Sequence, residues 1–141
     1  MRQHFRSGSP YEDRIGFARA VRVGGRVLVS GTAPVPPPGQ AVAPDAYDQT
    51  MRCGEIIAAA LSEAGTSMAD VVRTRIFLVD AADAEAVGRA HRALFGEARP
   101  AATMVVVAAL LDPAWRVEVE AEALVGCGAD PRDGGEAGPL E

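Results

Sequence analysis

Residues 117–123 of the chain read Val117-Glu118-Val119-Glu120-Ala121-Glu122-Ala123. Small apolar residues alternate with glutamates, and a period of two is typical of a β-strand that buries one face. We expect the apolar side chains to face a helix layer, while the three carboxylates share the opposite face, ~7 Å apart. The pattern predicts a strand over residues 116–124.

A second strand, predicted over residues 71–79, carries charges of the opposite sign. Arg73 and Arg75 share one face, and the other face carries Val72, Thr74, Ile76 and Leu78. One interpretation is a wetted face on which arginines and glutamates pair across strands. The other is a face covered by a partner subunit, where a glutamate with a raised pKa serves as a general acid or base.

The remaining elements follow from periodicity and turn residues. Residues 17–23 and 26–30 flank Gly24-Gly25, which predicts a β-hairpin with positive φ at both glycines. Helical spacing predicts helices over residues 47–64 and 83–95, the first capped by Asp45 and ended by Gly65. A strand is expected over residues 102–109, and a short edge strand near His4. The order ββαβαββ predicts an α+β domain with a mixed sheet and two helices on one face.

The bulk composition restricts the class of protein. The 141 residues, of which 48% are hydrophobic, fit a single domain, predicted over residues 1–126. Residues 127–141 are rich in glycine, proline and acids, so a disordered tail is expected. No apolar stretch approaches the ~20 residues that cross a bilayer, and residues 1–6 lack a signal-peptide core. We therefore expect a cytoplasmic protein with no membrane partner. The net charge of −5 gives a nucleic-acid surface no global support.

Metal and cofactor signals are weak. The candidate ligands His4, His91, Cys53 and Cys127 show no ligand spacing, so no metal site is expected. Phosphate-loop glycine patterns are absent as well, and we expect no cofactor.

Five segments, in order, resemble landmarks of the Rid (YjgF-type) family. They are Val27-Leu28-Val29-Ser30-Gly31, Ala64-Gly65, residues 70–80, Arg99-Pro100-Ala101 and Val117-Glu118-Val119-Glu120-Ala121. The resemblance covers about residues 14–125. It implies a chorismate-mutase-like fold and a homotrimer with a barrel-like core and clefts between subunits.

The resemblance also implies a site. In the deaminase members of the family an arginine binds the substrate carboxylate, and a glutamate positions the water that attacks a 2-imino acid. The glutamate falls on Glu118, and the Ser-Gly pair that would polarise the substrate falls on Ser30 and Gly31. The aromatic that closes the pocket falls on Phe17, where deaminases usually have tyrosine, and Thr32 follows the Ser-Gly pair into the expected pocket.

The family's arginine is missing. Its position falls on Ala102, and Met104 and Val106, expected on the same strand face, are apolar. Neither Arg99 nor Arg116 replaces it in an obvious way. A guanidinium–carboxylate clamp is therefore not expected at this position. The pocket should suit a substrate that is larger or less anionic than the small 2-imino acids.

Two further residues have alternative interpretations. His91 lies on the apolar stripe of the second helix, as a packed histidine or as an acid/base group near the cleft. Trp115 precedes the last strand, either as a packing residue or as a cap on a cleft.

The leading hypothesis is a cofactor-free enzyme that hydrolyses, or processes by proton transfer, an imine or enamine intermediate. The alternatives are a small-molecule-binding regulatory trimer without turnover, and the endoribonuclease activity assigned to some family members.

Overall fold

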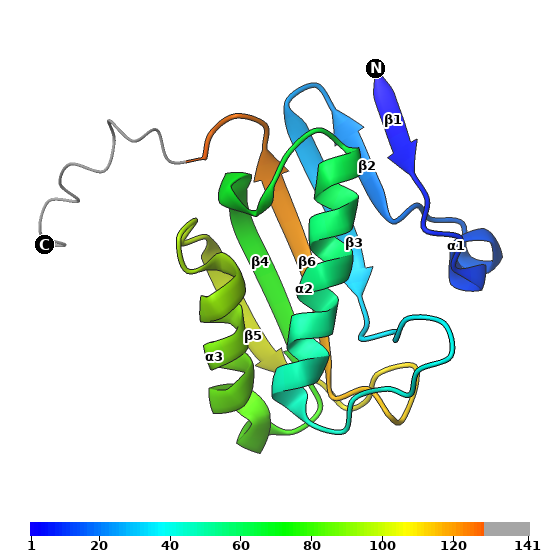
Figure 1. Ribbon diagram of the computed structural model, residues 1–141, viewed down its shortest axis with the longest axis vertical. Helices are drawn as coiled ribbons and strands as arrows, with labels where there is room; N and C mark the ends of the chain where they lie inside the picture. The colour runs from blue at the N-terminus through cyan, green and yellow to red at the C-terminus, as the bar shows by residue number, and fades with distance from the viewer. Residues whose placement is uncertain (129–141) are drawn as a thin grey trace, which may run out of the picture.

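The computed structural model describes residues 1–128 as one layer of strands and one layer of helices (Figure 1). The strands are β1 (Arg2–Phe5), β2 (Ala20–Val23), β3 (Arg26–Thr32), β4 (Val71–Leu78), β5 (Ala101–Val106) and β6 (Val117–Leu124). The helices are α1 (Pro10–Ile15), α2 (Ala46–Glu63) and α3 (Ala84–Phe95), with 3-10 turns at Met68–Asp70 and Ala81–Asp83. The predicted α+β class is confirmed.

The six strands form one mixed sheet in the order β1-β2-β3-β6-β4-β5. All neighbours are antiparallel except β4 and β5, which are parallel and connected through α3. The predicted edge strand near His4 is β1. The hairpin between β2 and β3 is present, but the prediction of positive φ at both its glycines is wrong, because only Gly24 has it (58°).

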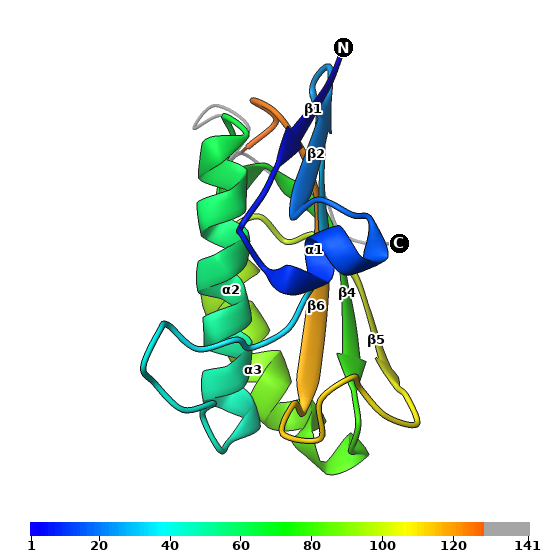
Figure 2. The same cartoon turned by 90° about the vertical axis from the view of Figure 1, so that its right-hand side faces the viewer.

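Both long helices cover the same face of the sheet (Figure 2). The alternating apolar residues of β3, β4 and β6 meet them there, and Ile57, Leu61 and Phe95 fill the layer between. Complete burial of one such side chain contributes about 1.5–3 kcal/mol to folding. Asp45 caps α2 by accepting the Asp48 amide at 2.8 Å, as predicted. No helix in residues 1–128 is long and apolar enough to cross a membrane.

The start of β4 departs from the predicted alternation. Its pairing with β6 shifts by one residue between Val71 and Arg73. Val71 is therefore buried, and Val72 is exposed rather than facing the helices with Thr74. Such a bulge adds one residue to one strand and reverses the side-chain order locally.

Helix α1 was not predicted, although its signals are present. Ser9 is the N-cap and accepts the Tyr11 amide at 3.3 Å, with Pro10 at the first helical position. Glu12 is buried and accepts the Ser7 amide at 3.1 Å and the Ser7 hydroxyl. Residues 17–19, between this helix and the sheet, are irregular, and β2 begins at Ala20 rather than at residue 17.

A buried carboxylate holds the chain after β6. Asp70 accepts the Gly128 amide at 2.6 Å, the Gly126 amide at 3.1 Å and the Thr66 hydroxyl at 2.6 Å. The predicted tail, residues 127–141, thus begins inside this contact, and residues 129–141 lie outside the described part of the chain. Burial raises the pKa of Asp70, but the hydrogen bonds outweigh it and leave the pKa below its ordinary value of 3.8.

We expect Asp70→Asn to lower the free energy of unfolding by about 1–3 kcal/mol near neutral pH, because a buried charged acceptor is lost. A carboxyl with a lowered folded-state pKa adds stability above its unfolded pKa, and that stability disappears as the pH falls through the folded value. Urea unfolding between about pH 7 and about pH 3 should therefore show that the difference in free energy of unfolding between wild type and variant becomes smaller as the pH falls.

The control is Asp80→Asn. Asp80 is an exposed cap that accepts one amide, from Ala82 at 2.9 Å, and asparagine caps equally well. If the difference in free energy of unfolding between wild type and Asp70→Asn does not change with pH, Asp70 is not charged in this contact.

Candidate functional site

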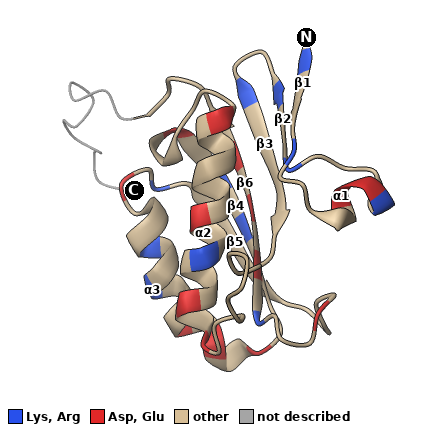
Figure 3. Ribbon diagram, turned by 45° about the vertical axis from the view of Figure 1, so that its right-hand side comes forward, with Lys and Arg blue, Asp and Glu red and all other residues tan. Residues whose placement is uncertain are grey.

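The three glutamates of β6 differ in their partners. Glu120 pairs with Arg75 at 2.9 Å, and Glu122 pairs with Arg26 at 3.0 Å. On the sheet face opposite the helices, basic positions of β4 lie beside acidic positions of β6 (Figure 3). Glu118 forms no ion pair with any residue of the described chain. The cross-strand interpretation therefore holds for Glu120 and Glu122, and Glu118 is the carboxylate that remains available for chemistry.

An irregularity in β3 brings the backbone against Glu118. The pairing of β3 with β6 shifts between Val29 and Thr32. At Gly31, within this shift, an added Cβ would lie 2.8 Å from Oε2 of Glu118. Only a glycine lets the carboxylate approach this closely. Bulges of this kind redirect side chains next to functional sites.

Arg19 is a charged residue of the site that was not predicted from the sequence. Its Nη2 donates to the carbonyl of Gly31 at 2.6 Å, and its guanidinium lies 5.6 Å from the centre of the Phe17 ring. Its Nε is buried and has no hydrogen-bond partner within residues 1–128. The available signal was the spacing of two between Phe17 and Arg19, which favours a shared face in extended chain.

The electrostatics of the site follow from this geometry. Burial raises the pKa of Glu118; Arg19 lowers it in part, and Glu120 raises it further. Burial lowers the pKa of Arg19, against the attraction of Glu12 and Glu118. A carboxyl with a raised pKa is a better proton acceptor when ionised, and it titrates closer to neutral pH.

Glu118 and Arg19 line a cavity of about 490 Å³, together with Ser30 and Gly31. Its remaining wall is largely apolar and includes Tyr11, Ile15, Phe17, Val35, Leu111 and Trp115. A second carboxylate, Glu120, also lines the cavity. Tyr11 and Trp115 meet edge to face, with ring centres 6.4 Å apart. Helix α1 therefore has a direct part in the site, because it supplies Tyr11.

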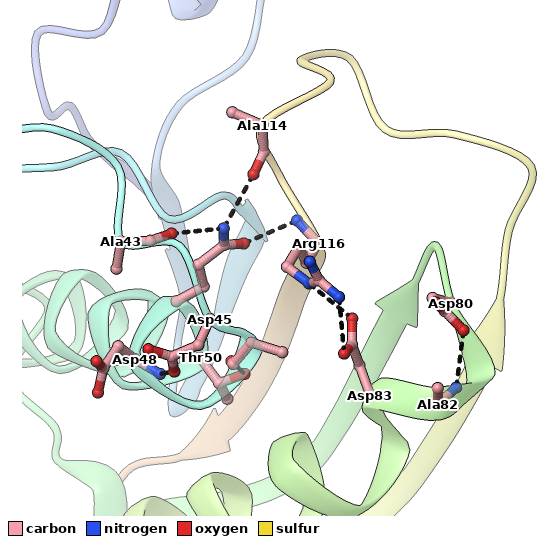
Figure 4. Close-up of polar contacts among 11 residues, drawn as sticks. Ala43, Asp45, Asp48, Thr50, Asp80, Ala82, Asp83, Ala114 and Arg116 are labelled. Atoms are coloured by element: carbon pink, nitrogen blue, oxygen red, sulfur yellow. Dashed lines mark hydrogen bonds and ion pairs between the residues drawn. The ribbon is translucent and has the colours of Figure 1, made fainter.

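A buried amide fixes the loops behind this wall. Gln49 donates to the carbonyls of Ala43 at 2.8 Å and Ala114 at 2.9 Å, and accepts the Arg116 amide at 2.7 Å. Figure 4 shows the Ala43 and Ala114 carbonyls and the Arg116 amide converging on one point. The position of Trp115, next to Ala114, thus depends on the core-facing side of α2.

Five of the predicted site residues line this cavity: Phe17, Ser30, Gly31, Trp115 and Glu118. Ser30 is already bonded, since its hydroxyl donates to the Ala18 carbonyl at 2.7 Å. Its oxygen is therefore placed to accept a hydrogen bond rather than to donate one. Thr32 does not line the cavity: it is fully buried, and its hydroxyl donates to the Ser30 carbonyl at 2.8 Å, within the irregular part of β3.

The three apolar residues predicted on β5 do not meet Glu118 within one chain. Ala102, Met104 and Val106 pair with Thr74, Ile76 and Leu78 of β4, whose side chains face the helices. Glu118 lies opposite Phe77, on the other face of the sheet. A second copy of the chain would have to supply these three residues to a cavity of this one.

His91 is also distant from the cavity wall. Its Nε2 lies 2.8 Å from the hydroxyl of buried Thr74, and its ring packs 4.9 Å from that of Phe95. Burial lowers the pKa of His91. Within the described chain, this is the environment of a packed histidine.

Within this chain, neither Arg99 nor Arg116 replaces the arginine that the family has at the position of Ala102. Arg116 forms a two-pronged contact with Asp83, at 2.9 and 3.1 Å (Figure 4). Arg99 follows α3 at positive φ (48°) and lies beside the C-terminal end of that helix. Among residues 1–128, no cluster of three or more His, Cys, Asp or Glu side chains is arranged to hold a metal ion.

Comparison with known proteins places the chain in a family. Residues 11–125 match the Endoribonuclease L-PSP family. An uncharacterised protein of Streptomyces coelicolor is 42% identical over 120 residues, covering 85% of this chain and 90% of that protein. The 2-iminobutanoate/2-iminopropanoate deaminase of Salmonella typhimurium is 33% identical, over 77% of this chain and 86% of the enzyme.

A solved structure shows the same fold. A member of the YjgF/YER057c/UK114 family from Mycobacterium tuberculosis superposes with a TM-score of 0.82 at 41% identity, covering 89% of this chain and 100% of that one. The resemblance drawn from the sequence is confirmed over most of the chain's length. The chain belongs to the Endoribonuclease L-PSP family, the family of the YjgF-type proteins.

Proposed function

We propose that this protein hydrolyses an imine or enamine intermediate, with Glu118 as the group that positions and deprotonates water. The observation that carries the proposal is the state of Glu118: half-buried, without an ion-pair partner in the described chain, and set against Gly31 in a cavity. A carboxylate used only for stability would be expected to pair as Glu120 and Glu122 do.

The reaction needs little from the protein. Glu118 accepts a proton from water while the water oxygen bonds to the carbon of a protonated C=N group, whose π electrons move to nitrogen. Glu118 then returns the proton to the nitrogen of this adduct. The C–N bond breaks, ammonia leaves, and the adduct's hydroxyl loses its proton to solvent as the C=O group forms.

The shape of the cavity favours a substrate with an apolar body. Tyr11, Phe17 and Trp115 offer aromatic surface, and a cavity of about 490 Å³ exceeds the needs of an imine with one or two side-chain carbons. A small imine would leave this surface wet. Each buried CH₂ contributes about 0.8 kcal/mol, so a bulkier side chain gains affinity that a small one lacks.

We further propose that the active assembly is a homotrimer. The sheet face opposite the helices carries Arg73, whose buried Nε has no partner within residues 1–128. The edge strand β5 exposes Val105 (43%) and Val106 (54%). A second copy packed here would cover these apolar residues and bring a β5 strand to the mouth of a neighbouring cavity.

Glu118→Gln should reduce imine turnover about 10²-fold or more, the usual effect of losing a general base. Glu120→Gln is the matched control on the same strand, and it should have a much smaller effect because Glu120 already pairs with Arg75. The assay follows loss of an imine generated in situ. Equal and small losses in both variants would show that Glu118 is not the general base, whereas a wild type without turnover would favour the non-catalytic binding trimer.

The pH profile gives an independent check. Because burial raises the pKa of Glu118, the acid limb of kcat should lie above the ordinary carboxyl value of 4.5. Turnover should fall as the pH drops through this limb, since a protonated carboxyl cannot accept a proton from water. The limb should be absent from the residual activity of Glu118→Gln.

Gly31→Ala should separate activity from stability. The new Cβ would meet only the mobile end of Glu118, at 2.8 Å, so the side chain can swing away at small cost in stability. Turnover should nevertheless fall by about tenfold or more, because misplacement of a reacting group by ~1 Å is costly. Gly88→Ala, with open space around the added methyl, should leave turnover unchanged. Full activity in Gly31→Ala would show that the carboxylate position is unimportant.

Light scattering on the purified chain should give three times the chain mass at micromolar concentration. Val105→Glu should break the assembly without unfolding the subunit, because this side chain is exposed in the single chain. Ala59→Glu is the control, on the exposed outer side of α2, and should leave the mass unchanged. A monomeric wild type would remove the trimer and any site shared between subunits.

A further inference from the structure

The guanidinium of Arg19 is incompletely used by the chain itself. Of its five N–H donors, the described residues engage one amino group, through the 2.6 Å bond from Nη2 to the Gly31 carbonyl. Nε is buried without a partner. Arg19 also forms no ion pair with Glu118, although both line the same cavity. A half-buried cation in this state is expected to have an anionic partner when the site is filled.

Two contacts restrain the guanidinium. The Gly31 carbonyl fixes one side, and the Phe17 ring lies 5.6 Å from the central carbon. A planar fork held in this way recognises carboxylates through paired N–H donors, which a lysine ammonium cannot do. The apolar wall formed by Tyr11, Phe17 and Trp115 lines the same cavity.

We propose that Arg19 binds the carboxylate of the substrate, and that the cavity takes 2-imino acids with an aromatic or similarly bulky apolar side chain. The side chain lies against Tyr11, Phe17 and Trp115, and the carboxylate meets the guanidinium on the β2 side of the cavity. The C=N carbon then lies next to the Glu118 carboxylate. The anion is thus recognised from the segment just before β2, within the same chain as Glu118, and does not require the β5 position occupied by Ala102. The part of this proposal that concerns the imine rests on the proposed function.

Binding can be tested without turnover, using two ligands of the same shape. The probes are 3-phenylpropanoate and 3-phenylpropanamide, which differ in charge but share the phenyl group and chain length. Trp115 is the single tryptophan of the chain and lines the cavity, so its fluorescence reports occupancy there. Titration of the wild type should show the carboxylate binding about tenfold or more tightly than the amide, the range of a charge-assisted hydrogen bond.

Arg19→Gln should abolish this preference and give both probes the same Kd, with folding checked by thermal melting. Arg19→Lys keeps the charge but loses the paired N–H donors, so its preference for the carboxylate should fall between those of wild type and Arg19→Gln. Arg92→Gln is the control for a lost positive charge: Arg92 is exposed in the last turn of α3 and lies outside the cavity lining, and the preference should match that of wild type.

Three results would overturn the proposal. They are equal binding of the two probes by wild type, a carboxylate preference that survives in Arg19→Gln, and no change in Trp115 fluorescence with either probe. If Arg19→Gln does not fold, Arg19→Lys decides, and a preference equal to that of wild type would overturn the proposal.

The experiment also separates this inference from the proposed function. Glu118→Gln should keep or strengthen the carboxylate preference, because it removes a repelling charge from the cavity. A wild type that shows the preference but hydrolyses no imine generated in situ, that of phenylalanine included, refutes the proposed function and leaves the anion site standing. A wild type that hydrolyses the imine but shows no preference for the carboxylate refutes the anion site and leaves the proposed function standing.

Discussion

The close approach of one carboxylate to one glycine organises the site. Glu118 can lie against β3 only because residue 31 has no Cβ, and β3 presents residue 31 only because its register with β6 shifts there. The carbonyl of the same glycine accepts a hydrogen bond from Arg19, so the carboxylate of Glu118 and the guanidinium of Arg19 both contact one residue of β3. Thr32 supports that segment from the core side. A general base, a cation and a bulge are therefore one structural unit rather than three separate features.

Much of this could be predicted from periodicity. The alternation in residues 117–123 correctly placed Glu118, Glu120 and Glu122 on the face away from the helices, because a period of two depends only on the pleat. The resemblance to a family then selected Glu118 among them. The sequence could not show that Glu120 and Glu122 have arginine partners whereas Glu118 has none, because that depends on the strand order β3-β6-β4 and on two irregular pairings.

The parts that escaped prediction are those set by tertiary contacts or by short elements. Helix α1 spans only six residues, too few for a clear apolar stripe, yet it supplies Tyr11 to the cavity. Arg19 follows Phe17 in a segment that was expected to be plain strand, and its role emerges only when the hairpin at Gly24-Gly25 brings Gly31 back beside it. Ala102, Met104 and Val106 were grouped with Glu118 by family position, but within one chain the sheet separates them.

The buried amide of Gln49 has a consequence for how this cavity can diverge among relatives. It joins the segment before α2 to the segment before β6, so two of the longest irregular stretches of the chain share one anchor in the helix layer. The part of the cavity wall that these two stretches supply, with Val35, Leu111 and Trp115, is thus not a set of independent loops. Substitutions that reshape it must either keep both carbonyls within reach of that amide or replace the anchor altogether. Changes of specificity are therefore easier at an exposed side chain such as Leu111, which takes no part in the Gln49 contacts.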